Sequence, residues 1–250
     1  MLARFRADLH IHTCLSPCGD LEMSPRGIVE AALEKRLDLI AICDHNTGEN
    51  IAATVRAAAR AGGRLKVLAG MEICSAEEVH ILALFERPEQ ALDLQDLIYA
   101  HLPPRSNRPE VFGEQVIANE LDEVEGFNDR LLIAATDLEA AAVIHAVHQR
   151  GGLLVASHID RPAYSILGQL GFIPPDLEID GLEISKGCDF DGLLARHPDL
   201  AGRPVIRSSD AHFLVDVGAA WTEFLLAEPV LAEMVLALRA HDGRRIAGLS

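Results

Sequence analysis

The sequence predicts one α/β domain around a mostly parallel sheet that is closed, or nearly closed, into a barrel. Short apolar runs rich in β-branched residues alternate with helical patterns along the chain. Polar residues recur at or just after the C-terminal ends of these runs, where parallel α/β architectures build their sites. The length of 250 residues suits a single domain over 1–250. A doubly wound open sheet is the alternative architecture.

The first half of the chain reads as strand, helix, strand and helix, followed by two strands and a helix. Ser24-Pro25 opens the first helix, because Ser is a favoured N-cap and Pro fits the first helical position. Gly62-Gly63 ends the second helix. The strands are expected at residues 5–11, 38–43, 65–74 and 79–85, and the later helices at 50–61 and 88–100.

A different kind of segment interrupts this alternation at residues 103–135. Its Pro, Arg and Asn content rises, and two extended runs flank Gly126-Phe127-Asn128, which predicts an inserted hairpin that acts as a lid. Thr136 and Glu139 then form a capping-box pattern that opens a helix ending at Gly151-Gly152. The remaining strands are expected at 153–157, 181–185, 204–207 and 221–226, with a last helix at 229–241.

Composition and charge narrow the class of protein. The formal net charge of −16 predicts a surface that repels polyanions, so we expect no duplex nucleic acid as a partner and favour a small phosphorylated substrate or nucleotide. No apolar stretch is long enough for a signal peptide or a membrane span, so no membrane association is expected. Five cysteines in such a chain favour reduced thiols in a cytoplasmic protein.

Imidazoles and carboxylates gather at six separate strand ends. His10 and His12 project to the same side of one strand, because residues two apart share a face. A mixed set of imidazoles and carboxylates indicates a multinuclear hydrolytic site, since carboxylates can bridge two ions. The other strand ends carry Asp44-His45-Asn46, Gly70-Met71-Glu72, His80, Ser157-His158 and Asp210-Ala211-His212.

The stretches DLHIHT, DHN, GMEI, EVHIL, SHID and SDAH resemble the polymerase and histidinol phosphatase (PHP) superfamily over nearly the whole chain. The resemblance implies a distorted (β/α)7 barrel and two or three divalent metal ions. By its motifs, one ion is held by His10, His12, Glu72 and Asp210, and Glu72 bridges to a second ion held by His80 and His158. A third ion is placed on Asp20, His45 and His212; family members vary at Asp20, which is favoured over Glu22.

The expected reaction is hydrolysis of a phosphomonoester on a small metabolite or nucleotide, or at the 5′ end of a short oligonucleotide. A metal-bound water, with Asp210 and His212 beside it, supplies the nucleophile, and no Gly-x-Ser-x-Gly or phosphate-loop pattern suggests another one. Manganese, iron and zinc all remain open as the metal. A non-catalytic, metal-braced regulatory module and a metal-dependent amide hydrolase are the alternatives.

Two cations and two thiols lie near the predicted mouth of the site. Arg161 and Lys186 are candidates to bind a substrate phosphate, and the alternative is that each is a solvated loop cation. Arg105, Arg108 and Arg130 in the insert are weaker candidates. For the Cys14/Cys18 pair, zinc binding is possible in principle, but a tight loop is the preferred interpretation.

Overall fold

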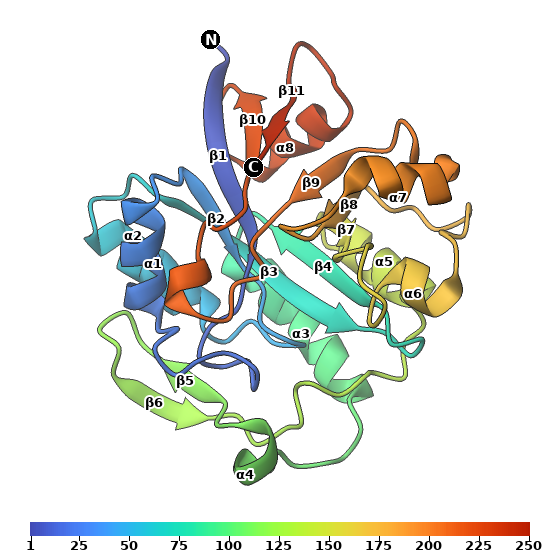
Figure 1. The fold of residues 1–250 in the computed structure, drawn as a ribbon. Helices are drawn as coiled ribbons and strands as arrows, with labels where there is room; N and C mark the ends of the chain where they lie inside the picture. The colour runs from blue at the N-terminus through green and yellow to red at the C-terminus, as the bar shows by residue number, and fades with distance from the viewer.

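The computed structural model describes all residues from 1 to 250 and contains a nine-stranded sheet that curves into a nearly closed barrel (Figure 1). The predicted fold class is therefore confirmed. Across the sheet, the strands follow the order β11 (Arg245–Leu249), β10 (Thr222–Leu226), β1 (Ala3–Ile11), β2 (Leu39–Ile42), β3 (Lys66–Cys74), β4 (His80–Phe85), β7 (Leu153–Ala156), β8 (Gly181–Ile184) and β9 (Val205–Arg207).

The barrel closes where the segment after β9 meets the end of β1. Ile11 and Ala211 form a parallel bridge, in which the His12 N–H donates to the Ala211 carbonyl at 3.0 Å. Strands β1, β2, β3, β4, β7, β8 and β9 therefore make the ring, while β10 and β11 extend it from β1 as an antiparallel flank. Strand β4 is antiparallel to both of its neighbours, so its first residue, His80, lies at the same mouth as the last residues of the other strands.

Helices cover the outside of this ring. In Figure 1, α1 (Pro25–Glu34) and α2 (Ile51–Arg60) lie on one side, and α5 (Ala140–Gln149), α6 (Ile166–Leu170) and α7 (Phe190–Arg196) lie on the other. Helix α3 (Pro88–His101) passes behind the sheet, and α8 (Leu231–Leu238) packs near β10 and β11. The predicted N-cap is confirmed, because Ser24 Oγ accepts the Gly27 N–H at 3.1 Å. No helix of the structure has the length and hydrophobicity that crossing a membrane requires.

The strands are apolar on both faces, as expected when helices cover one face and the barrel interior fills the other. On β2, Leu39 and Ala41 belong to a buried cluster of 16 residues that draws on every ring strand except β8, whereas Ile40 and Ile42 pack in the larger cluster with the outer helices. Leu82 on β4 belongs to the smaller cluster, and His80 lies two residues before it on the same face. The interior face therefore leads directly to the polar residues at the mouth.

The insert forms a hairpin, but its turn lies earlier than predicted. Strands β5 (Val116–Ala118) and β6 (Val124–Phe127) pair antiparallel, so Gly126 and Phe127 are strand residues rather than the turn. Asn119 fixes the turn, because its Oδ1 accepts the N–H groups of Leu121 and Glu123 at 2.9 and 3.1 Å. The run at 129–135 forms only an isolated bridge between Arg130 and Ser106; beside the hairpin lies the short helix α4 (Pro109–Phe112).

The capping box predicted at Thr136 and Glu139 is wrong. Thr136 Oγ1 donates instead to the Cys74 carbonyl at 3.0 Å, and α5 begins at Ala140. The Ala140 N–H donates to the carboxylate of Glu77, a tertiary partner that replaces a local cap. Helices α6 and α7, the 3-10 turns Pro198–Leu200 and Leu214–Asp216, and strand β11 were not predicted.

Candidate metal centre

The candidate metal ligands meet at the mouth of the barrel, where the chain leaves the ring strands through tight turns. Asn46 after β2, His158 after β7 and Asp210 after β9 have positive φ angles of 55°, 29° and 50°. Non-glycine residues rarely adopt this conformation, and functional sites are where it concentrates. These turns direct side chains from distant parts of the sequence toward one point.

Glu72 lies at the centre of this convergence and is buried. Its Oε1 lies 2.9 Å from His80 Nδ1 and 3.1 Å from His158 Nε2, and its Oε2 lies 3.1 Å from His45 Nδ1. Nε2 of His10 and of His12 both lie 3.4 Å from the same carboxylate. Each oxygen of Glu72 therefore faces its own set of imidazoles, which is the arrangement that a carboxylate bridging two cations requires.

His10 and His12 show that this cluster fits divalent cations. The Nδ1 of His10 lies 3.0 Å from Glu183 Oε2, and the Nδ1 of His12 lies 2.9 Å from Ser16 Oγ, whose own hydroxyl donates to Asp44. With Nδ1–H donated outward, the Nε2 atom of each ring faces inward, and the two Nε2 atoms lie 3.1 Å apart. Asp210 Oδ1 joins them at 3.3 and 3.2 Å and has no hydrogen-bond partner although it is buried. These nitrogen and oxygen atoms lie close enough together to bind a cation.

The protonation states of the cluster also suit metal binding. Although burial opposes ionisation, His80 and His10 hold the pKa of Glu72 well below its usual range, and His10 does the same for Asp210. Burial lowers the pKa of His12 to about 4 and that of His45 well below its usual range, so both rings are neutral. Metal ligands of this kind must be ionised carboxylates and neutral imidazoles.

His10 and His80 differ from His12 and His45, because nearby carboxylates raise their pKa values more than burial lowers them. Glu183 and Asp210 raise the pKa of His10 above its usual range, and Glu72 raises the pKa of His80 to about 10. Protons on these two rings balance the negative charge of the metal-free cluster. A cation that binds there displaces them.

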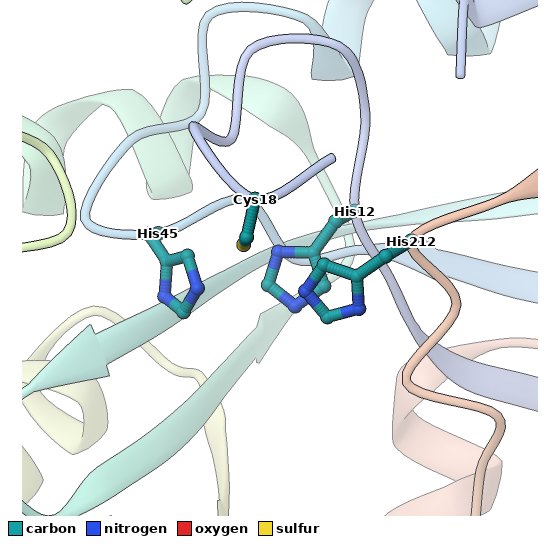
Figure 2. Close-up of side chains that lie close together, drawn as sticks. All are labelled: His12, Cys18, His45 and His212. Atoms are coloured by element: carbon teal, nitrogen blue, oxygen red, sulfur yellow. The ribbon is translucent and has the colours of Figure 1, made fainter. Parts of the chain in front are cut away.

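The structure brings eight of the nine predicted ligands together and leaves Asp20 apart. Asp20 Oδ1 accepts the Glu22 N–H at 2.8 Å, and Asp20 belongs to none of the groups whose ligand atoms lie close enough to share an ion. In its place Cys18 joins the group at His45 and His212, and its sulfur points toward the rings (Figure 2). The three groups are His10, His12 and Glu72; His45, Glu72 and His80; and His12, Cys18, His45 and His212.

The two predicted phosphate-binding cations have different surroundings. An Arg161 guanidinium nitrogen lies 2.6 Å from Asp210 Oδ2, and the side chain remains 43% exposed. Arg161 also lines a hollow of about 180 Å³ together with His80, His158 and Tyr164. Lys186 instead pairs with Asp216, with Nζ 2.9 Å from Oδ1, and is not among the residues that line this hollow. Of these two cations, Arg161 is therefore the one that lies beside the cluster.

Sequence reasoning missed several residues that position the ligands. Glu183 is a buried carboxylate in the otherwise apolar strand β8. A single acidic residue in an apolar strand is the sequence signal that could have identified it. Asp8 is buried beside the cluster and accepts hydrogen bonds from Ser209 and from the Gly218 N–H, which fixes the segment that carries Asp210. The link from Asp44 through Ser16 to His12 depends on a loop conformation that the sequence does not specify.

Two family models match the chain. The PHP domain matches residues 8–170, and the PHP-associated model matches residues 199–242. Among curated proteins, the uncharacterized protein MJ1587 of Methanocaldococcus jannaschii is 26% identical over 197 residues, which cover 76% of this chain and 86% of that protein. The 5'-3' exoribonuclease Rnm of Escherichia coli is 36% identical over 80 residues, 31% of this chain, and the match spans only 26% of Rnm.

Among solved structures, endonuclease Q from Pyrococcus furiosus has the same fold, with a TM-score of 0.70 at 19% identity over 99% of this chain. The chain spans 58% of that protein. A structure of an endonuclease Q complex with a 27-mer duplex that has an abasic lesion at the active site matches with a TM-score of 0.68 at 18% identity.

This likeness corrects the expectation that duplex nucleic acid is excluded as a partner. That expectation was wrong because it rested on the net charge of −16, a property of the whole surface. Contact with phosphates depends on the local potential of the cleft, where bound cations can be the largest charges. A fold of this kind accommodates a duplex in endonuclease Q.

The family match covers well over half of the chain, and its residues include most of the ligands that converge on Glu72. Membership of this family favours an enzyme over a non-catalytic regulatory module. The chain belongs to the PHP family and is a metal-dependent hydrolase of that family.

Proposed function

We propose that this protein hydrolyses phosphoester bonds in nucleic acid strands, using divalent cations held around Glu72. The observation that carries the proposal is the position of Arg161. This side chain contacts a carboxylate of the metal cluster and also lines an open hollow. Its guanidinium pairs with Asp210, and its exposed remainder lines the hollow beside His80 and His158. A phosphate bound there would lie next to the cluster.

The residues around the hollow can orient a strand for the reaction. When bound, divalent cations would polarise the phosphoryl group and supply an activated water. Arg161 can donate hydrogen bonds to a non-bridging phosphate oxygen while Asp210 fixes the guanidinium. Tyr164 stacks on His80 with ring centroids 4.8 Å apart, and 46% of the residue is exposed. An exposed aromatic ring beside a phosphate site offers a stacking surface for a base.

The comparisons support a nucleic acid substrate over a small metabolite. Rnm is a 5'-3' exoribonuclease, and endonuclease Q acts on a lesion in a duplex. Both act on strands, although each is longer than this chain. We therefore propose that the reaction occurs at a phosphodiester of an RNA or DNA strand.

The test is cleavage of labelled strands by the protein reconstituted with manganese, iron or zinc. The panel holds single-stranded RNA and DNA, an intact duplex and a duplex with an abasic site, with the label at either end. We expect metal-dependent shortening of at least one strand, inhibition by vanadate, and no shortening with His10→Ala. An intact panel in the presence of wild-type protein with verified bound metal would refute the proposal.

A further inference from the structure

Cys18 lies where a turn of the chain folds back over two imidazoles. The ligand atoms of Cys18, His45, His212 and His12 all lie within 4.8 Å of one another, and Figure 2 shows the Cys18 sulfur pointing toward His45 and His12. Cys18 itself is solvent-exposed, whereas His12 and His45 are buried. The thiol is therefore reachable from solvent and faces the cluster.

The loop that carries Cys18 is held in this position by its own backbone. The Gly19 N–H donates to the Ser16 carbonyl at 2.9 Å, and the Asp20 N–H donates to the carbonyl of His212 at 2.9 Å. A Cβ at Gly19 would lie 2.4 Å from the Thr13 carbonyl oxygen, so only glycine lets the loop close this tightly. The second bond ties the loop directly to the segment that bears His212.

We propose that the thiolate of Cys18, rather than the carboxylate of Asp20, joins His45 and His212 as a ligand of the third cation that the family resemblance implies. The thiolate gives this position a preference for zinc that the carboxylate-rich positions around Glu72 do not share. The inference rests on the proposed function, because it assigns one metal position within the same site. His12 lies at the edge of this group, since its Nε2 is 3.1 Å from His10 Nε2 and 3.2 Å from Asp210 Oδ1.

The chemistry of the three donors gives the metal preference. Zinc bonds to imidazole nitrogen and thiolate sulfur at about 2.0–2.3 Å, whereas manganese and magnesium prefer oxygen ligands. The carboxylates of Glu72 and Asp210 are ligands for the other two metal positions, whereas only the position at His45 and His212 has a sulfur ligand. Three protein ligands also leave a fourth coordination position open for water or for a substrate oxygen.

Two neighbouring groups in the same loop do not fit the role. Asp20 would have to give up the hydrogen bond that its Oδ1 accepts from the Glu22 N–H at 2.8 Å. Cys14 is buried and its Sγ lies 3.7 Å from the Val116 carbonyl oxygen, beneath the hairpin. Cys18 is thus the one thiol that joins the imidazoles.

Cobalt(II) substitution tests the sulfur ligand directly, because a cobalt–thiolate bond gives strong charge-transfer absorption in the near ultraviolet. We expect this band in wild-type protein loaded with cobalt and its loss in Cys18→Ser. Asp20→Asn is the matched control, since the asparagine Oδ1 can still accept the Glu22 N–H, and it should keep the band. A wild-type spectrum without the band, or a band that survives in Cys18→Ser, would overturn the inference.

Alkylation of the thiols tests the metal preference. Zinc should slow the modification of Cys18 by iodoacetamide by roughly tenfold or more, since a bound thiolate is shielded. Manganese should not slow it. Cys188, which is partly exposed and belongs to none of the ligand groups, gives the internal reference in the same peptide digest. Equal modification of Cys18 with and without zinc would contradict the proposal.

These readouts do not depend on turnover. Cleavage of strands by a protein that shows no thiolate band and no zinc protection would leave the proposed function standing and reject the third site. A cobalt–thiolate band in a protein that leaves every strand intact would retain the site and reject the proposed function.

Discussion

Glu183 Oε2 lies 3.0 Å from the Nδ1 of His10, and both side chains are buried. The same oxygen accepts the backbone N–H of His158 at 3.0 Å. One carboxylate from β8 therefore orients a ligand on β1 and another that follows β7. Such outer partners fix the tautomer of a ligand histidine and tune its basicity.

Replacing this carboxylate should weaken metal binding without removing a ligand. For Glu183→Gln we expect roughly 10- to 100-fold lower affinity for zinc or manganese, because the charge that supports His10 is lost. Competition with a chromophoric chelator measures the affinity for the metal. Glu178→Gln, at an exposed carboxylate near His148, should bind metal like wild type. Equal affinities in the two variants would show that Glu183 does not support the ligands.

Asp210→Asn should abolish most turnover while the fold remains. The substitution removes the charge of a carboxylate that faces His10 and His12 and holds Arg161. We expect turnover to fall by roughly 100-fold or more, with an unchanged circular dichroism spectrum. Asp216→Asn changes a carboxylate that pairs with Lys186 outside the cluster and serves as the matched control. Wild-type turnover in Asp210→Asn would rule out its role as a ligand.

Arg161→Ala should mainly weaken substrate binding. A charge-assisted hydrogen bond to phosphate contributes about 1.5–3 kcal/mol, so we expect KM for a cleaved strand to rise roughly 10- to 100-fold. Lys186→Ala, which removes the other predicted cation, should have a smaller effect because Lys186 pairs with Asp216 outside the cluster and does not line the hollow at Arg161. Steady-state kinetics on both variants decides between them. A larger effect at Lys186 would reverse the assignment.

Most of the barrel was predictable because its strands follow from local patterns. The run at Leu39–Ile42 is buried on both faces and could only be an internal strand, and Ser24-Pro25 specifies a helix start through local chemistry alone. The strand-end ligands followed from this alternation. Most of them meet at Glu72 because parallel strands end at the same mouth.

The remainder depended on partners that are far away in sequence. The sequence pattern predicts Thr136 as a local helix cap, but its hydroxyl donates to the carbonyl of Cys74. The N–H of Ala140, the first residue of α5, donates to the carboxylate of Glu77 instead. The choice between Asp20 and Cys18 depends on how one loop closes around Gly19, which no spacing rule determines. The exclusion of duplex nucleic acid failed because net charge says little about the potential at a site.

The metal-free protein should lose stability as the pH rises from about 7 to about 10. Against the effect of burial, Glu72 raises the pKa of His80 from 6.5 to about 10. A raised folded-state pKa stabilises the fold fully below the unfolded value of 6.5, and this contribution disappears as the pH passes about 10. Melting temperatures of metal-free wild type and His80→Ala measure it. The difference between the two proteins should shrink over that interval, and a constant difference would contradict the shift.

Asn50 should contribute substantially to stability because it joins the hairpin to the barrel. Its Nδ2 donates to Thr13 Oγ1 at 2.9 Å and to the Val116 carbonyl at 3.0 Å, and its Oδ1 accepts the Ala118 N–H at 3.0 Å. Asn50→Ala removes these three hydrogen bonds from a buried site, so the free energy of unfolding should fall by about 1–3 kcal/mol. Urea unfolding measures the loss. Gln149→Ala, an exposed amide deletion, should change it little; equal losses would mean that the bonds of Asn50 do not anchor the hairpin.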